Sequence, residues 1–203
     1  MDRLKYLDRR EVRKLTASAR RYAEVAQRDE AIRPIVRWMT VDLALATGLR
    51  AAEMVSILWR DLDENAAYIR VHRGKKRRGQ PVIEAIAISD SLVQHLVAYR
   101  ADLRARLRPA TDDDHVLQGE RGPLTRTALW RQWQYALKLA GLAPRPLHHA
   151  RHTLAVHLLR GTGNLRLVQK QLGHSNPTVT ANLYADVPYE DMRAAANGVY
   201  GDE

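Results

Sequence analysis

Apolar residues recur every three or four positions through most of the chain, a spacing typical of amphipathic helices. In residues 8–29 the apolar positions are Val12, Leu15, Ala19, Tyr22 and Val25. Asp8, with Glu11 three residues later, has the pattern of a capping box and predicts the start of this helix. The same spacing predicts further helices at 34–47, 51–58, 91–107, 127–140 and 148–161.

Between residues 67 and 89 the period changes to two. The segment YIRVHR is followed by the basic, glycine-bounded GKKRRGQ and then by PVIEAIAIS, which predicts an antiparallel hairpin or small meander. Residues 108–125 are predicted to be a loop because they are rich in Pro, Gly and Asp, and residues 165–187 predict two short helices around a turn at 173–177. The predicted fold class is therefore mainly α with a small antiparallel β-sheet (α+β).

Length and composition narrow the classes of protein to consider. A chain of 203 residues has room for one domain and a short extension. It contains no membrane-length apolar run and no signal peptide, so we expect a cytoplasmic protein with no membrane partner. Because cysteine is absent, disulfides, thiolate metal sites and cysteine nucleophiles are excluded.

The charge of the chain indicates a phosphate-rich partner. Basic residues number 33 against 23 acidic ones, and 27 of the 33 are arginine, whose rigid fork of donors matches phosphate oxygens. A solvated basic surface is the alternative explanation. The charge is most concentrated around the predicted hairpin, in Arg70, Arg73, Lys75, Lys76, Arg77 and Arg78. These residues are candidates for contacts with DNA phosphates, although a merely solvated turn is equally compatible with them.

Other candidate residues are scattered along the chain. Arg50 and Glu53 share one face of a predicted helix, and so do His148 and Arg151, because each pair is three residues apart. Four histidines within residues 148–157 raise the possibility of a metal site, but no carboxylate or cysteine lies nearby at ligand spacing, so we expect no metal and no cofactor.

Residues 165–184 also have the pattern of a helix-turn-helix, the DNA-reading unit of many repressors. This pattern supports a competing hypothesis, a DNA-binding regulator without cleavage activity. His174 lies in the predicted turn and Tyr184 ten residues later; a tyrosine in such a place more often packs than reacts.

Five motifs in order decide between these hypotheses: TGLRAAE, GKK on the hairpin, HHARHT, LGHS and LY. Together they resemble the tyrosine recombinase (phage integrase) family over residues 6–187, with a catalytic domain like that of topoisomerase IB. The resemblance implies a site-specific DNA recombinase or integrase whose catalytic residues are Arg50, Lys75, His148, Arg151, His174 and Tyr184, with Glu53 as a supporting acid. Lys76, adjacent to Lys75, is the alternative general acid.

The resemblance also implies a reaction without metal or ATP. Arg50 and Arg151 would clamp the scissile phosphate, and His174 would add a third donor. Tyr184 would attack and form a 3′-phosphotyrosine bond, with His148 taking or holding its proton, while the hairpin lysine would protonate the departing 5′-oxygen.

The implied organisation is a catalytic domain over residues 1–187 and a C-terminal segment, 188–203, that is either exchanged between protomers or packed in cis. The expected partners are double-stranded DNA, three further copies in a homo-tetramer on DNA (with a monomer in its absence), and accessory DNA-bending proteins. We expect no core-binding domain in this chain, so it is either a fragment of a longer integrase or a compact member like the fimbrial-switch recombinases. A topoisomerase IB-like relaxing enzyme is a third hypothesis, and the target site and the biological purpose, such as movement of a mobile element, stay open.

Overall fold

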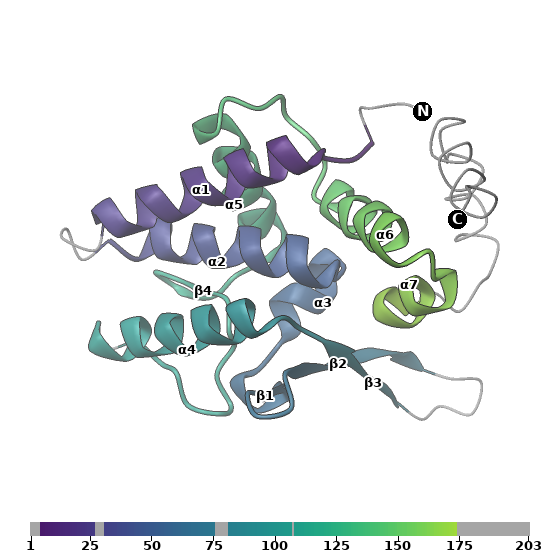
Figure 1. Cartoon of the computed structure of the whole chain (residues 1–203). Helices are drawn as coiled ribbons and strands as arrows, with labels where there is room; N and C mark the ends of the chain where they lie inside the picture. Colours follow the sequence, from purple (N-terminus) through teal and green to yellow (C-terminus); the bar gives the residue numbers. More distant parts are fainter. Residues whose placement is uncertain (1–4, 27–30, 76–80, 107, 174–203) are drawn as a thin grey trace, which may run out of the picture.

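The computed structural model describes residues 5–26, 31–75, 81–106 and 108–173 (Figure 1). The helices are α1 (Arg9–Ala26), α2 (Ile32–Thr47), α3 (Ala51–Ser56), the 3₁₀ turn η2 (Trp59–Asp61), α4 (Asp90–Ala105), α5 (Arg126–Leu139), α6 (His148–Thr162) and α7 (Leu165–Leu172). The strands are β1 (Leu62–Asp63), β2 (Tyr68–Lys75), β3 (Pro81–Ala87), β4 (Gln118–Gly119) and β5 (Gly122–Pro123). The predicted fold class, mainly α with a small antiparallel sheet, is confirmed.

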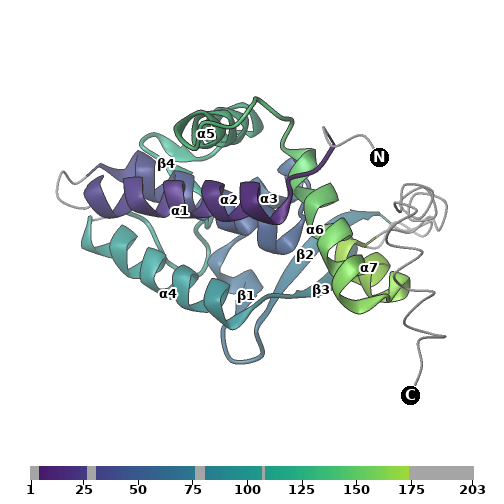
Figure 2. The same ribbon diagram turned by 45° about the horizontal axis from the view of Figure 1, so that its top comes forward.

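Helix α2 is the centre of the fold. It packs against α1, α4, α5 and α6, so most other helices are arranged around it (Figures 1 and 2). Ten of its sixteen residues are buried, which is why its sequence is apolar over a broad face. Since α2 ends at Thr47, three residues before Arg50, the central helix of the described fold positions this candidate residue.

Local capping interactions explain where the helices begin. Asp8 and Glu11 exchange backbone-to-carboxylate hydrogen bonds of 2.8 and 3.0 Å, which confirms the predicted capping box. Ser89 and Thr125 cap α4 and α5 in the same way, each accepting a hydrogen bond from a backbone N–H three residues later. Each described α-helix begins within two residues of its predicted start.

The face that α1 turns to the core differs from the predicted one. The structure buries Leu15, Ala19, Ala23 and Ala26, whereas Tyr22 and Val25 are 47% and 63% exposed. Alanines were weaker apolar signals than tyrosine or valine in the sequence, yet only their small side chains allow α1 to lie close to α2 along this stripe.

The sheet contains the predicted hairpin and one additional strand. β2 pairs with β3 from Tyr68 opposite Ala87 to Lys75 opposite Pro81, with an irregularity between Arg73 and Lys75. The two-residue β1 adds to the other edge of β2, and β4 pairs with β5 inside the predicted loop 108–125. Strands of two residues show no alternation of polarity, so the sequence pattern could not predict them.

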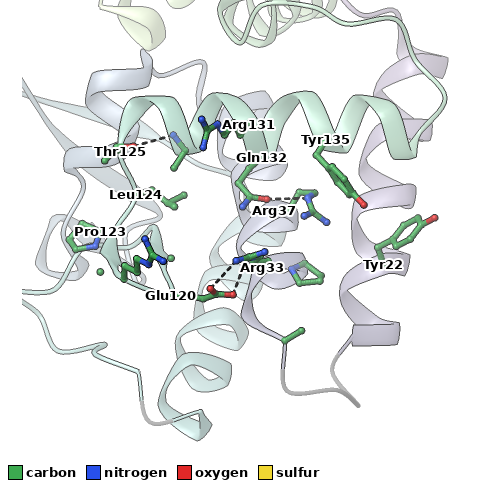
Figure 3. Close-up of a pocket in the computed structure, with 16 residues that line it drawn as sticks. Tyr22, Arg33, Arg37, Glu120, Pro123, Leu124, Thr125, Arg131, Gln132 and Tyr135 are labelled. Atoms are coloured by element: carbon green, nitrogen blue, oxygen red, sulfur yellow. Dashed lines mark hydrogen bonds and ion pairs between the residues drawn. The ribbon is translucent and has the colours of Figure 1, made fainter.

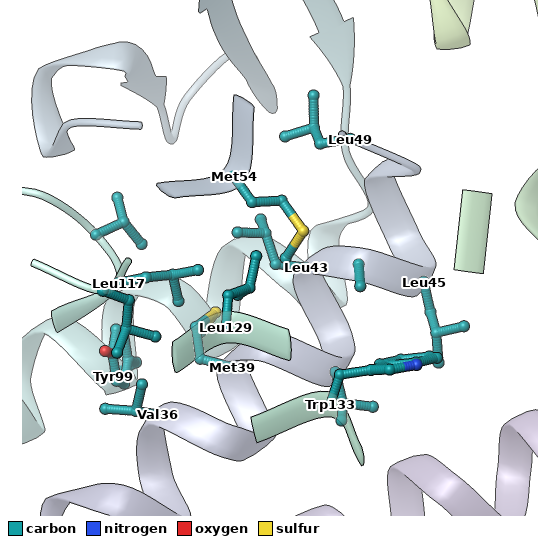
Figure 4. Close-up of a cluster of buried hydrophobic side chains, with 14 of the residues drawn as sticks. Val36, Met39, Leu43, Leu45, Leu49, Met54, Tyr99, Leu117, Leu129 and Trp133 are labelled. Atoms are coloured by element: carbon teal, nitrogen blue, oxygen red, sulfur yellow. The ribbon is translucent and has the colours of Figure 1, made fainter. Parts of the chain in front are cut away.

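Large apolar side chains fill the space between α2, α4 and α5. Met39, Leu43, Leu129 and Trp133 are fully buried there (Figure 4). We expect Leu43→Ala to lower the free energy of unfolding by about 2–5 kcal/mol, because it opens a cavity that rigid neighbours cannot fill. Chemical denaturation measures this change; a loss below about 1 kcal/mol would mean that the core around α2 is loosely packed.

Several predictions concern residues outside the described part of the chain. They are the hairpin tip with Lys76, Arg77 and Arg78, the second helix of the predicted helix-turn-helix with His174 and Tyr184, and the C-terminal segment 188–203. Among the described residues, no helix combines the length and apolar character needed to cross a membrane.

Candidate active site

The turn from α2 into α3 places Arg50 at the start of α3. Gly48 ends α2 in a left-handed conformation with φ of 62°, and a Cβ atom there would lie 2.7 Å from Leu172 Cδ2 and 3.0 Å from Leu154 Cδ2. Only glycine fits both the backbone angle and the contact with the last residue of α7. The TGLR motif is therefore a sharp turn that brings Arg50 beside α6 and α7.

Glu53 holds Arg50 in place from within α3. Its carboxylate accepts hydrogen bonds of 2.8 Å from the Arg50 backbone N–H and from Arg50 Nη1. Glu53 is 8% exposed, whereas the Arg50 side chain is 53% exposed. The buried carboxylate thus orients an arginine whose remaining donors face solvent, as expected for a supporting acid.

Arg151 reaches the turn between α2 and α3 from α6. We call the place where this turn, Arg151 and the end of α7 meet the junction. Arg151 Nη1 donates to the Gly48 carbonyl at 2.8 Å, across 103 positions of sequence, and its Nη2 donates to the Leu172 carbonyl at 2.6 Å. These two acceptors lie at the C-terminal ends of α2 and α7, where carbonyl groups carry partial negative charge. One planar guanidinium therefore joins three helices and is held in a single orientation.

Positive charge outweighs negative charge around Arg151, because Arg50 and Arg73 act on it together with the single carboxylate of Glu53. Burial, followed by repulsion from nearby Arg50, lowers the pKa of Arg151 to about 10; Glu53 opposes this change and Arg73 adds to it. Arg151 remains charged at neutral pH. An anion placed between Arg50 and Arg151 would relieve this repulsion, so the junction is electrostatically suited to phosphate.

Helix α6 also carries His148 as its first residue, exposed and one turn before Arg151. The helix is anchored where the chain enters α1, because Thr153 Oγ1 accepts a 2.8 Å hydrogen bond from the Leu7 N–H. In the segment before α6, Arg145 pairs with Glu11 at 2.6 Å. His148 and Arg151 therefore lie in the first turn of α6, as predicted, and the start of this helix is anchored by contacts with the start of the chain's first helix.

The hairpin approaches α3 from the other side of the junction. Arg70 is exposed, as expected for a residue that contacts DNA, and Lys75 is the last residue of β2. Of the predicted set, the structure thus brings together Arg50, Glu53 and Arg151 next to the strand that ends in Lys75, and His148 lies one turn before Arg151 on α6. His174 directly follows Gly173, which ends α7 beside this group.

Arg73 requires a correction. The prediction places it among exposed DNA-contacting residues, but its side chain is 8% exposed and pairs with Glu84 at 2.8 Å and Glu53 at 3.5 Å. It lies on the inner face of β2, after Ile69 and Val71, both of which are buried. Strand alternation contained this signal, whereas the high density of basic residues obscured it. No motif in the sequence points to Glu84, the partner of Arg73 on β3.

A basic cavity of about 1130 Å³ lies at the opposite end of α2 (Figure 3). Its arginines are Arg33, Arg37, Arg121 and Arg131. Arg37 donates to Gln132 at 3.1 Å and stacks on Tyr135, and burial lowers its pKa. Since α2 rises about 1.5 Å per residue, about 20 Å separates this cavity from the turn at Gly48, and the predicted catalytic residues that the structure describes do not line it.

Comparisons with known proteins show which family this chain resembles in sequence. The model of the phage integrase family matches residues 5–191. Tyrosine recombinase XerD of Staphylococcus saprophyticus is 31% identical over 160 residues, which cover 77% of this chain and 52% of that protein, so the chain spans about half the length of this relative.

Solved structures show the same fold. XerA recombinase superimposes with a TM-score of 0.73 at 23% identity, covering 98% of this chain and 64% of the other. The XerH site-specific recombinase, bound to its difH substrate in a pre-cleavage complex, gives a TM-score of 0.69 at 22% identity and covers 95% of this chain and 52% of the other.

Proposed function

This chain belongs to the phage integrase family, and we propose that it is a site-specific DNA recombinase that breaks and rejoins DNA through a 3′-phosphotyrosine intermediate. The observation that carries the proposal is the junction of Gly48, Arg50 and Arg151. Two arginines from distant segments converge there with unused donors and mutual repulsion, an arrangement that favours a bound phosphate.

The arginine clamp supports the chemistry by stabilising charge. Arg50 and Arg151 donate to the nonbridging oxygens of the scissile phosphate, whose negative charge grows in the pentacoordinate transition state. Both guanidinium groups are oriented before DNA binds, Arg50 by Glu53 and Arg151 by two carbonyls, so little reorganisation is needed. His174 supplies a further donor in this scheme.

Strand cleavage then exchanges one phosphate ester for another. The Tyr184 oxygen forms a bond to phosphorus and its proton passes to His148, while the bond from phosphorus to the 5′-oxygen breaks. The 5′-oxygen takes a proton from Lys75, or from Lys76 in the alternative assignment. The phosphotyrosine conserves the bond energy, so a 5′-hydroxyl of a second duplex reverses the step with no ATP or metal.

The proposed partner is double-stranded DNA, as in the XerH complex. Arg37, Arg121 and Arg131 of the cavity fit contacts with backbone phosphates beyond the scissile one, whereas Arg33 is paired there with Glu120 at 2.9 Å. Exchange between two duplexes requires four active sites, for which we propose a homo-tetramer assembled on DNA with the help of DNA-bending proteins.

The competing regulator hypothesis makes no use of the junction. A helix-turn-helix protein needs a recognition helix, but it does not need a buried glutamate that orients Arg50 or an Arg151 bound to two helix ends. A topoisomerase-like activity shares the cleavage step and differs only in lacking synapsis of two duplexes.

The test is covalent capture on a nicked suicide duplex, in which a short 5′-terminated fragment diffuses away after cleavage. We expect a protein–DNA adduct that survives denaturant and forms equally well in EDTA without ATP. Binding of the duplex with no adduct on any of a panel of attachment-like sequences would instead support the regulator. Adduct formation followed by relaxation of a supercoiled plasmid without recombination would support the topoisomerase.

A further inference from the structure

Arg73 is a buried charge near the proposed active site that the mechanism does not use. Its Nη1 donates to Glu84 Oε2 at 2.8 Å, and its Nε lies 3.5 Å from Glu53 Oε1. The same Glu53 oxygen accepts the 2.8 Å hydrogen bond from Arg50 Nη1. Glu53 therefore joins a surface arginine, Arg50, to a buried one, Arg73.

The position of Arg73 also explains the glycine that ends α7. A Cβ atom on Gly173, which has φ of 64°, would lie 0.8 Å from Arg73 Nη1. The guanidinium thus occupies the volume that any other residue at position 173 would need. Helix α7 contacts β3 as well, and both views place its end beside the hairpin (Figures 1 and 2).

A role as the counter-ion of Glu84 does not by itself explain why Arg73 is buried at this position. The Glu84 side chain is 41% exposed, so water solvates its charge even when no arginine pairs with it. Burying an arginine costs desolvation energy, and a well-packed apolar pair in its place would be as stable or more so. What an apolar pair cannot do is connect β2 to Glu53 and to the end of α7.

We infer that Arg73 is a positioning residue, which connects the strand carrying Lys75 to Glu53 and thereby fixes the hairpin relative to Arg50 and to the end of α7. The inference rests on the proposed function, since the reaction is what the positioning serves. Release of β2 from α3 shifts the end of this strand, at Lys75, with respect to Arg50 and Arg151, and a displacement of about 1 Å in a catalytic site costs up to about 100-fold in rate.

The experiment is a cycle of four proteins: wild type, Arg73→Met, Glu84→Gln and the double variant Arg73→Met/Glu84→Gln. For each, single-turnover cleavage of the suicide duplex at saturating protein, the dissociation constant for DNA and the melting temperature are measured. The double variant is decisive because it retains the wild-type net charge and leaves neither member of the Arg73–Glu84 pair without its partner, but it lacks the connection to Glu53.

We expect Arg73→Met to lower the melting temperature and to slow cleavage by about 10- to 100-fold, with DNA affinity within about threefold of wild type. Glu84→Gln should cleave within about threefold of wild type, because the contact of Arg73 with Glu53 remains. The double variant should regain most of the melting temperature and stay slow. Recovery of the rate together with stability would overturn the inference and reduce Arg73 to the counter-ion of Glu84.

Arg100→Met is the matched control. Arg100 has a 16% exposed side chain, pairs with Asp112 at 2.6 Å and lies on α4, outside the proposed site. It should lose stability without slowing cleavage by the folded protein. A wild-type protein that forms no adduct refutes the proposed function itself; an adduct that forms at the wild-type rate in Arg73→Met refutes only the positioning role.

Discussion

Tyr184→Phe is expected to bind the target duplex with wild-type affinity and to form no covalent adduct. The substitution removes a single oxygen, the atom that the mechanism bonds to phosphorus, and retains the ring. No other group in the scheme replaces a missing nucleophile, so the loss is complete rather than partial. Denaturing gel electrophoresis of the suicide duplex measures the adduct, and a mobility-shift assay measures binding.

Tyr189→Phe provides the matched control, because Tyr189 lies five residues later in the same segment. This variant should form the adduct at the wild-type rate. If Tyr189→Phe abolishes the adduct and Tyr184→Phe does not, the nucleophile has been assigned to the wrong tyrosine. If both variants remain active, the nucleophile lies elsewhere in the chain.

Arg151→Lys is expected to slow single-turnover cleavage by about 10²- to 10³-fold, as loss of one preorganised transition-state donor typically does. Lysine preserves the charge but cannot donate to the Gly48 and Leu172 carbonyls while also donating to a phosphate. The defect should appear in the cleavage rate at saturating protein more than in DNA affinity, because the clamp acts most strongly on the charge that develops during reaction.

Arg160→Lys, nine residues further along α6, is the control for a change of arginine to lysine on the same helix. It should cleave at the wild-type rate. Equal rates for Arg151→Lys and wild type would show that the positive charge alone suffices and that the fixed orientation of the guanidinium has no catalytic importance.

The sequence predicted most of the fold because its local signals agree with the tertiary structure. Asp8 with Glu11 marks the start of α1, and Gly48 and Gly173 end α2 and α7 in left-handed turns. The exposed Tyr22 and Val25 show the limit of this approach. Hydrophobicity was read as burial there, whereas close packing of α1 on α2 selects small side chains.

The sequence could predict which residues belong to the candidate site, but not the contacts that hold them in place. Motif order identified Arg50 and Arg151, yet nothing local reveals that Arg151 is held by carbonyls from α2 and α7, since these contacts span 103 and 21 positions. Arg73 was misassigned because six basic residues within nine positions suggested an exposed tip. Its burial depends on Glu53 and Glu84, which come from other elements.

The most direct test of the account is the identity of the protein–DNA bond. Digestion of the adduct with trypsin should release residues 171–193, which contain Tyr184 and Tyr189, with DNA attached. Fragmentation in the mass spectrometer is predicted to place the nucleotide on Tyr184, joined through its 3′-phosphate. Attachment to any other residue, or through a 5′-phosphate, would contradict the proposed reaction.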